Sequence, residues 1–144
     1  MSSTEDPTAT AVRGSWAAAL NAAANRRPVV FHRGDQDFAL LPASLLRDVL
    51  RRALPAPEIV AEDDGWTVLL PGHPVAADGS TLDEALRDFV SALRDYADAW
   101  DDRLHRAPNH QHAAALVQHV SVSDDDELLA WASGPEGQPA LQQA

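Results

Sequence analysis

The sequence contains no cysteine and no lysine, and only 6% of its residues are aromatic. The absence of cysteine excludes disulfides, a thiolate nucleophile and zinc sites built on cysteine. No apolar run approaches the roughly 18 residues that a membrane-spanning helix needs. Residues 1–9 are polar and acidic, whereas a secretory signal would be basic and then apolar. We therefore expect a cytoplasmic protein.

The charge is divided unevenly along the chain. Residues 11–54 contain seven arginines and three acidic residues, a net charge of +4. Residues 58–133 contain four arginines and sixteen acidic residues, a net charge of −12. A basic block beside a strongly acidic one predicts two surfaces with different partners, a polyanion for the first and a basic protein for the second.

The first block has the pattern of a helix, a hairpin and a second helix. The spacing of large side chains predicts a helix over residues 11–26, strands over residues 29–32 and 37–41, and an amphipathic helix over residues 42–54. A unit spanning residues 11–54 is too small to bury its apolar face alone, so we expect a homodimer. The predicted dimer interface consists of Val12, Trp16, Leu20, Val29 and Phe31.

The arginines of this block have two interpretations. Three of them, Arg47, Arg51 and Arg52, are explained at least as well by the polar face of the second helix. The other four lie at helix ends and in the hairpin, where the fold would gather them on one edge and a dimer would double that edge. The predicted DNA-binding residues are therefore Arg13, Arg26, Arg27 and Arg33.

A second unit is predicted over residues 58–104. Residues 58–62 and 66–70 have the pattern of a β-hairpin, and residues 75–77 suit a third short strand. Thr81 opens a capping-box pattern, and apolar side chains then recur at helical spacing for about six turns. We expect two or three strands followed by a long helix.

The stretch from residue 105 to residue 133 is predicted to be helical, with one short helix over residues 112–120 and another capped by Ser123. Its apolar cluster either folds back on the second unit or contacts a partner protein, with the neighbouring acids steering a basic partner. The residues of the second alternative are Leu116, Val117, Val120, Leu128, Leu129 and Trp131. The tails, residues 1–10 and 134–144, are expected to be disordered.

No pattern in the sequence indicates catalysis. The histidines lack the spacing of a metal site, and the acid pairs at residues 63–64 and 101–102 fall at a turn and at a helix end, without a nucleophile or a phosphate loop. We expect a protein that is not an enzyme, with no cofactor and no metal.

Residues 10–42, with the sequence TAVRGSWAAALNAAANRRPVVFHRGDQDFALLP, resemble the N-terminal module of the prevent-host-death (Phd/YefM) antitoxins. Residues 58–100 are similar to the small domain of HicB-type antitoxins, through the DGW hairpin, the proline after the second strand and the DGSTLDEAL helix start. The resemblance implies an α+β protein with an N-terminal α-β-β-α dimerisation unit. In the family the first-helix arginine contacts DNA, and the matching position here is Arg13.

The resemblance also implies a function. Such a protein is the antitoxin of a type II toxin-antitoxin system, which neutralises a basic RelE-like toxin through residues 105–133 and represses its own operon as a DNA-bound dimer. The alternative is a stand-alone ligand- or RNA-binding regulator built on the HicB-like unit, with no toxin partner.

Overall fold

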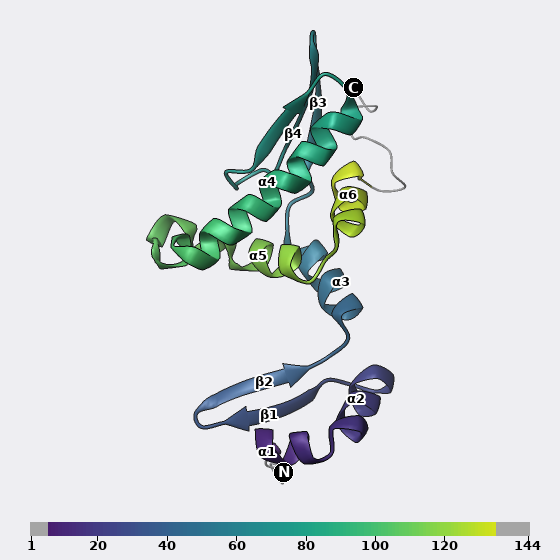
Figure 1. The fold of residues 1–144 in the computed structure, drawn as a ribbon, viewed down its shortest axis with the longest axis vertical. Coiled ribbons are helices and arrows are strands. Elements are labelled where there is room, and N and C mark those ends of the chain that lie inside the picture. Colours follow the sequence, from purple (N-terminus) through teal and green to yellow (C-terminus); the bar gives the residue numbers. More distant parts are fainter. Residues whose placement is uncertain (1–5, 135–144) are drawn as a thin grey trace. The chain divides into compact units, whose positions relative to one another are not determined.

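The computed structural model describes residues 6–134, which form two small antiparallel sheets and six α-helices (Figure 1). This mixed arrangement confirms the expected α+β class. The chain divides into two compact units, residues 1–46 and 47–144. Over residues 6–134, no helix is both long and apolar enough to cross a membrane. Residues 1–5 and 135–144, most of the predicted tails, lie outside the described residues.

The predicted first helix is interrupted in the structure. Thr8 caps α1 (Ala9–Gly14) by accepting a hydrogen bond from the backbone of Ala11, and α2 (Trp16–Asn25) begins after Ser15. Ser15 leaves the helical conformation, at φ −128° and ψ 45°, and its hydroxyl donates to the Ala11 carbonyl. Glycine followed by serine explains the break, because glycine is a poor helix former and serine competes for backbone hydrogen bonds.

The hairpin of the first unit pairs β1 (Val29–Arg33) with β2 (Gln36–Leu40). Phe31 stacks on Phe38 across the pair, with 5.7 Å between the ring centroids. The turn contains Gly34 at φ 61°, a conformation that favours glycine. The backbone of His32 donates a hydrogen bond to the carbonyl of Pro7, so the predicted N-terminal tail is ordered from at least Pro7 onward.

The boundary between the units lies inside α3 (Ala43–Ala53), between Leu46 and Arg47, rather than at the expected position around residues 55–57. The second half of this helix belongs to the second unit because its side chains pack there. Arg47 forms an ion pair with Glu127 at 2.6 Å and donates to the carbonyl of Val122 at 2.6 Å.

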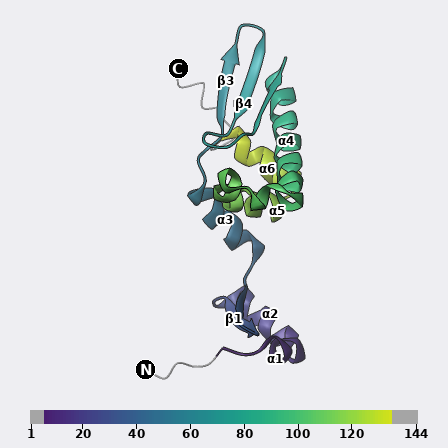
Figure 2. The same cartoon turned by 90° about the vertical axis from the view of Figure 1, so that its left-hand side faces the viewer.

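The second unit is built on a three-stranded antiparallel sheet. Its strands are β3 (Glu58–Glu62), β4 (Gly65–Leu69) and β5 (Ala76–Gly79), in that spatial order. The helix α4 (Leu82–Asp102) runs along one face of the sheet (Figure 2). The predicted strands and long helix are therefore present.

The start of α4 depends on a cluster of polar groups. The Thr81 side chain accepts a hydrogen bond from the Glu84 backbone, as the predicted capping box requires. The Glu84 carboxylate accepts from the backbone and the hydroxyl of Ser80, one residue before the predicted partner. These hydrogen bonds lower the pKa of Glu84 and satisfy groups that the helix itself leaves unpaired.

The C-terminal segments complete the second unit. Two 3-10 turns, Leu104–Arg106 and Pro108–Ala113, lead into α5 (Ala114–Ser121), and α6 (Asp125–Ser133) follows. Asp124 rather than Ser123 caps α6, in a capping box with Glu127. The core of the unit joins the sheet and α4 with both C-terminal helices, and its largest fully buried side chains are Phe89, Leu70, Leu93, Leu116, Leu128, His119, Val68 and Val120.

Candidate functional site

The first unit exposes large apolar side chains. Trp16 is 50% exposed and Leu20 is 42% exposed, although both lie on the face of α2 that the sequence pattern identified as apolar. Val12 is buried, whereas Val29 and Phe31 are half-buried. A shallow hollow of about 470 Å³ is lined by Ala9, Val12, Arg13, Trp16 and Phe31. The structure therefore brings three of the five predicted interface residues to one hollow.

The four predicted DNA-binding arginines are all exposed. Arg13 lies in the last turn of α1, Arg26 follows α2, and Arg33 ends β1, where its guanidinium lies 5.9 Å from the centre of the Phe38 ring. Within residues 6–134, none of the four forms an ion pair. Their positive charges face solvent from different elements, and Arg13 also lines the apolar hollow.

The basic block is smaller in the structure than in the sequence. Arg47, Arg51 and Arg52 belong to the second unit, and Arg47 is neutralised there by Glu127. Residues 6–46 retain four arginines against three acidic residues, a net charge of +1. The second unit, counted over residues 47–134, has seven arginines and seventeen acidic residues, a net charge of −10. Strong charge thus characterises the second unit only.

The side chains predicted to contact a partner lie mainly in the core. Leu116, Val117, Val120 and Leu128 are between 0% and 6% exposed, and Leu129 and Trp131 are half-buried against the same core. The structure agrees with the alternative in which this cluster folds back on the second unit. Of the six residues, only Leu129 and Trp131 are partly exposed to solvent, and each lines a surface hollow.

Arg94 fixes the connection between α5 and α6, a role that sequence analysis missed. Its guanidinium donates to the carbonyls of Val120 and Ser123, both at 2.7 Å, and to the carboxylate of Asp125 at 3.0 Å. Such hydrogen bonds from a charged donor are stronger than those between neutral groups. The signal in the sequence was only an arginine on the exposed face of a helix, which does not specify a partner 26 to 31 residues away.

A histidine is fully buried between the C-terminal helices. The His119 ring meets the Trp131 ring edge-on, with 4.6 Å between the centroids, and its Nε2 atom is buried with no hydrogen-bond partner among the described residues. Burial, and then the positive charges of Arg51 and Arg47, lower the pKa of His119 to about 4. His119 is therefore neutral in the folded protein at neutral pH.

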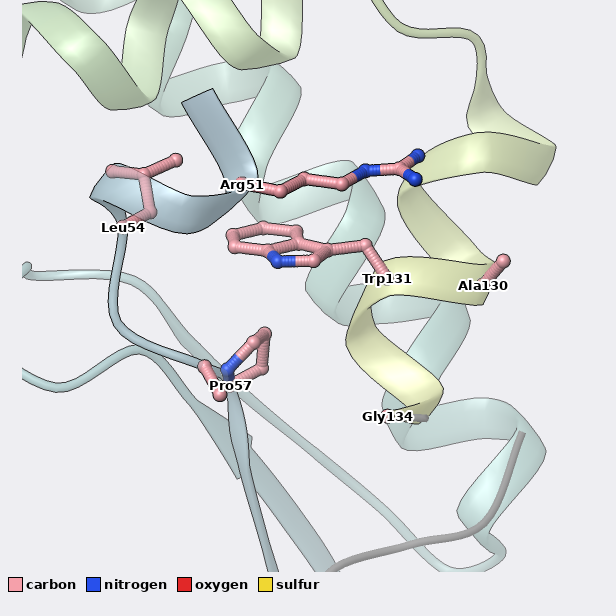
Figure 3. A pocket seen from close by; sticks show the side chains of 7 residues that line it. Arg51, Leu54, Pro57, Ala130, Trp131 and Gly134 are labelled. Carbon is pink, nitrogen blue, oxygen red and sulfur yellow. The ribbon is translucent and has the colours of Figure 1, made fainter. Parts of the chain in front are cut away.

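Trp131 also borders a surface pocket of about 320 Å³ (Figure 3). In Figure 3 its indole ring, from α6, extends toward Leu54 and Pro57, and the side chain of Arg51 crosses toward α6. The Nε atom of Arg51 is buried without a hydrogen-bond partner among the described residues. The pocket therefore offers a part of the Trp131 surface beside a cation.

Over residues 6–134, no group of three or more histidine or acidic side chains is arranged to hold a metal ion. Burial, and then repulsion by His112, lower the pKa of His73, whose ring centroid lies 5.2 Å from that of His112.

The chain is thus a small α+β protein of two units, of which the second is strongly acidic. A family model described as PHD_like, "Antitoxin of toxin-antitoxin, RelE / RelB, TA system", matches residues 3–130. The match covers most of the chain, so the chain belongs to this family of antitoxins. Sequence analysis predicted an antitoxin, and the family confirms that class; assignment to the Phd/YefM subfamily and the HicB-like domain stay predictions.

A solved structure from Syntrophomonas wolfei subsp. wolfei has a similar fold, with a TM-score of 0.69 and 17% sequence identity. The similarity covers 89% of this chain and 96% of that one. That protein is described as an antitoxin part of an inferred toxin/antitoxin system. The search of curated proteins found no match.

Proposed function

We propose that this antitoxin neutralises a basic, RelE-like toxin by direct binding, and that it represses its own operon by binding operator DNA as a dimer. The observation that carries the proposal is the net charge of −10 on residues 47–134, in a protein of an antitoxin family. Such a unit attracts a cationic partner and speeds their encounter. The description of the family, which names RelE / RelB, supports a RelE-like toxin as the partner.

The first unit supplies the proposed dimer and DNA contacts. Exposed Trp16 and Leu20, with the hollow that Val12 and Phe31 line, leave an apolar surface that a second copy would cover. Arg13 lies beside this hollow. Two copies related by a two-fold axis would therefore present paired arginines to the two halves of a palindromic operator.

Replacing Arg13 tests the DNA contact. We expect Arg13→Gln to weaken binding to the promoter of its own operon by about tenfold, because one charged phosphate contact is lost in each protomer. Gel shifts over a series of salt concentrations measure the loss. The matched control is Arg87→Gln, which changes an arginine of the second unit that is also exposed and whose ion pair with Asp83 lies on the surface. Wild-type protein that shows no salt-sensitive binding to this DNA contradicts the proposal.

For the toxin contact, we propose the exposed part of α6, where Leu129 and Trp131 line two separate hollows. Asp125 and Asp126 are exposed at its start, and Leu129 lines the same hollow. Trp131 borders the pocket of Figure 3. The hollow of Leu129 is lined by two acids and Arg87, and the pocket of Trp131 lies beside Arg51, so the net charge of the whole unit supplies the attraction to a basic partner. Aromatic anchors carry much of the binding free energy at protein interfaces. The fully buried side chains within residues 105–133 pack in the core and hold α6 in position.

Replacing Trp131 tests the toxin contact. We expect Trp131→Ala to weaken binding of the basic protein encoded by the neighbouring frame by about 2 kcal/mol. Isothermal titration of the purified pair measures this, and thermal unfolding measures the stability lost beside His119. The control is Val68→Ala, which removes a buried side chain from β4 without changing the α6 surface. If both variants weaken binding equally, the effect is one of stability. If no neighbouring product is bound or neutralised, the proposed function is wrong.

A further inference from the structure

The strand β3 forms an open edge of the three-stranded sheet. It pairs with β4 only, and β4 uses its other side for β5. The backbone N–H of Leu70 donates a hydrogen bond to the carbonyl of Val75, the residue just before β5. The backbone N–H and C=O groups of the even-numbered residues of β4 therefore point toward β5. The odd-numbered residues of β4 therefore bond to Glu58, Val60 and Glu62, because the direction of backbone bonding alternates along a strand.

This alternation leaves the N–H and C=O groups of Ile59 and Ala61 directed outward. No backbone hydrogen bond within residues 6–134 uses this side of β3. An unpaired row of such groups is a template for one more strand. Peptides bind other sheet edges in this way, with backbone bonds for affinity and alternate side chains for specificity.

The side chains beside this edge have a distinct pattern. Glu58, Val60 and Glu62 share the sheet face that points away from α4, and Val60 is 40% exposed between the two carboxylates. A strand added at the edge would place three of its own side chains directly opposite these residues. In an antiparallel arrangement, these would be the pairs without backbone hydrogen bonds, whose side chains lie closest together and interact most strongly.

Two carboxylates on this face share one hydrogen-bond donor. The hydroxyl of Thr67 lies 3.1 Å from the Glu62 carboxylate and 2.6 Å from the Asp78 carboxylate, yet it has a single proton to donate. One of the two carboxylates is therefore left without that hydrogen bond at any moment. A guanidinium, with five N–H donors, matches such a pair of acceptors.

A second copy of β3 is a poor occupant of this edge. Antiparallel pairing centred on Val60 would place each Glu58 opposite the Glu62 of the other copy, and like charges directly opposite destabilise a sheet. A basic strand meets the same positions with opposite charge. The charge pattern thus selects a partner of different sequence.

We propose that β3 is the docking edge for a strand of the toxin with a basic residue, an apolar residue and a basic residue at alternate positions. This inference rests on the proposed function. It names the sheet edge of the second unit to which a strand of the toxin would be added. The apolar residue packs beside Val60, and the two basic side chains pair with Glu58 and Glu62.

The test uses the full chain and two blocked synthetic peptides, TRTVTRT and TETVTET. Titration followed by NMR measures both affinities. We expect the basic peptide to bind at least about tenfold more tightly than the acidic one, because two charge pairs replace two repulsions. The backbone amides of Ile59 and Ala61 should become protected from hydrogen exchange when it binds. Equal affinity for both peptides, or unchanged exchange at these two amides, overturns the proposal.

Matched proline variants locate the site. Ala61→Pro removes an outward N–H from β3 without removing a bond to β4, and Ala76→Pro does the same at the opposite edge, on β5. We expect Ala61→Pro to lose about tenfold in affinity for TRTVTRT and Ala76→Pro to bind as wild type does. If Ala61→Pro does not fold, the double variant Glu58→Gln and Glu62→Gln should show the same loss. Wild-type affinity in that double variant contradicts the proposal.

The same variants separate this inference from the proposed function. A chain that binds TRTVTRT at β3 but neutralises no neighbouring gene product leaves the docking edge correct and the proposed function wrong. A toxin that is neutralised equally well by the wild type and by folded Ala61→Pro leaves the antitoxin function correct and the docking edge wrong.

Discussion

A chain that ends after Arg103 should lose the cooperative unfolding of its second unit. The deletion removes Leu116, Val117, Val120 and Leu128, which are all buried against α4. At about 1.5 to 3 kcal/mol for each buried side chain, the loss is about 6 to 12 kcal/mol, comparable to the whole stability of a typical domain. Thermal unfolding followed by circular dichroism measures the transition.

The control for this deletion is a chain that ends at Gly134, which keeps every core residue that the structure describes. It should unfold as cooperatively as the full chain. The comparison matters for toxin binding, because a chain cut at Arg103 would release the toxin whether or not residues 105–133 touch it. A cooperative transition in the shorter chain would contradict the assignment of α5 and α6 to the core.

Acidification should destabilise the second unit through His119. The pKa of this residue is about 4 in the folded protein and about 6.5 when unfolded, so the unfolded state binds the proton more tightly. The contribution of His119 to the free energy of unfolding is therefore fully present above pH 6.5 and is lost as the pH falls toward 4. The shift corresponds to about 3 kcal/mol, because each pKa unit is worth about 1.4 kcal/mol. Urea unfolding at a series of pH values measures this slope.

The variant His119→Leu isolates the contribution of this one group. It fills similar space without a titratable ring, so the variant should lose about 3 kcal/mol less than the wild type between pH 6.5 and pH 4. Subtracting the two curves removes the carboxylates and His73, which also respond to acid. Identical curves for the two proteins would show that the pKa of His119 is the same in the folded and unfolded states.

The sequence predicted the elements better than their boundaries. The hairpins were predictable because turn residues such as Gly34 and the pair Asp63 and Asp64 lie between short runs that contain β-branched or aromatic residues. The helix α4 was predictable because its apolar spacing continues over six turns. The break at Ser15 was not predicted, since apolar periodicity continues through it and only local hydrogen bonding interrupts the helix.

The site residues were harder to predict, because burial depends on contacts between distant segments. The periodicity of α3 marked Arg47 as a surface residue, but Glu127, eighty residues later, covers it. The same pattern of leucine, valine and tryptophan in residues 114–133 suits either a core or an interface, and only the packing on α4 distinguishes them. For the first unit, exposure of Trp16 agrees with a predicted interface but does not identify its occupant.

The placement of α6 in the core also sets an order of events during synthesis. The first unit is complete once Leu46 has been made, whereas the second cannot close until Ser133 has been added, 87 residues later. At about 5 to 20 residues per second, the ribosome needs between about 4 and 17 seconds for that stretch. A nascent chain thus has its N-terminal unit ready to assemble well before its acidic unit is able to capture anything.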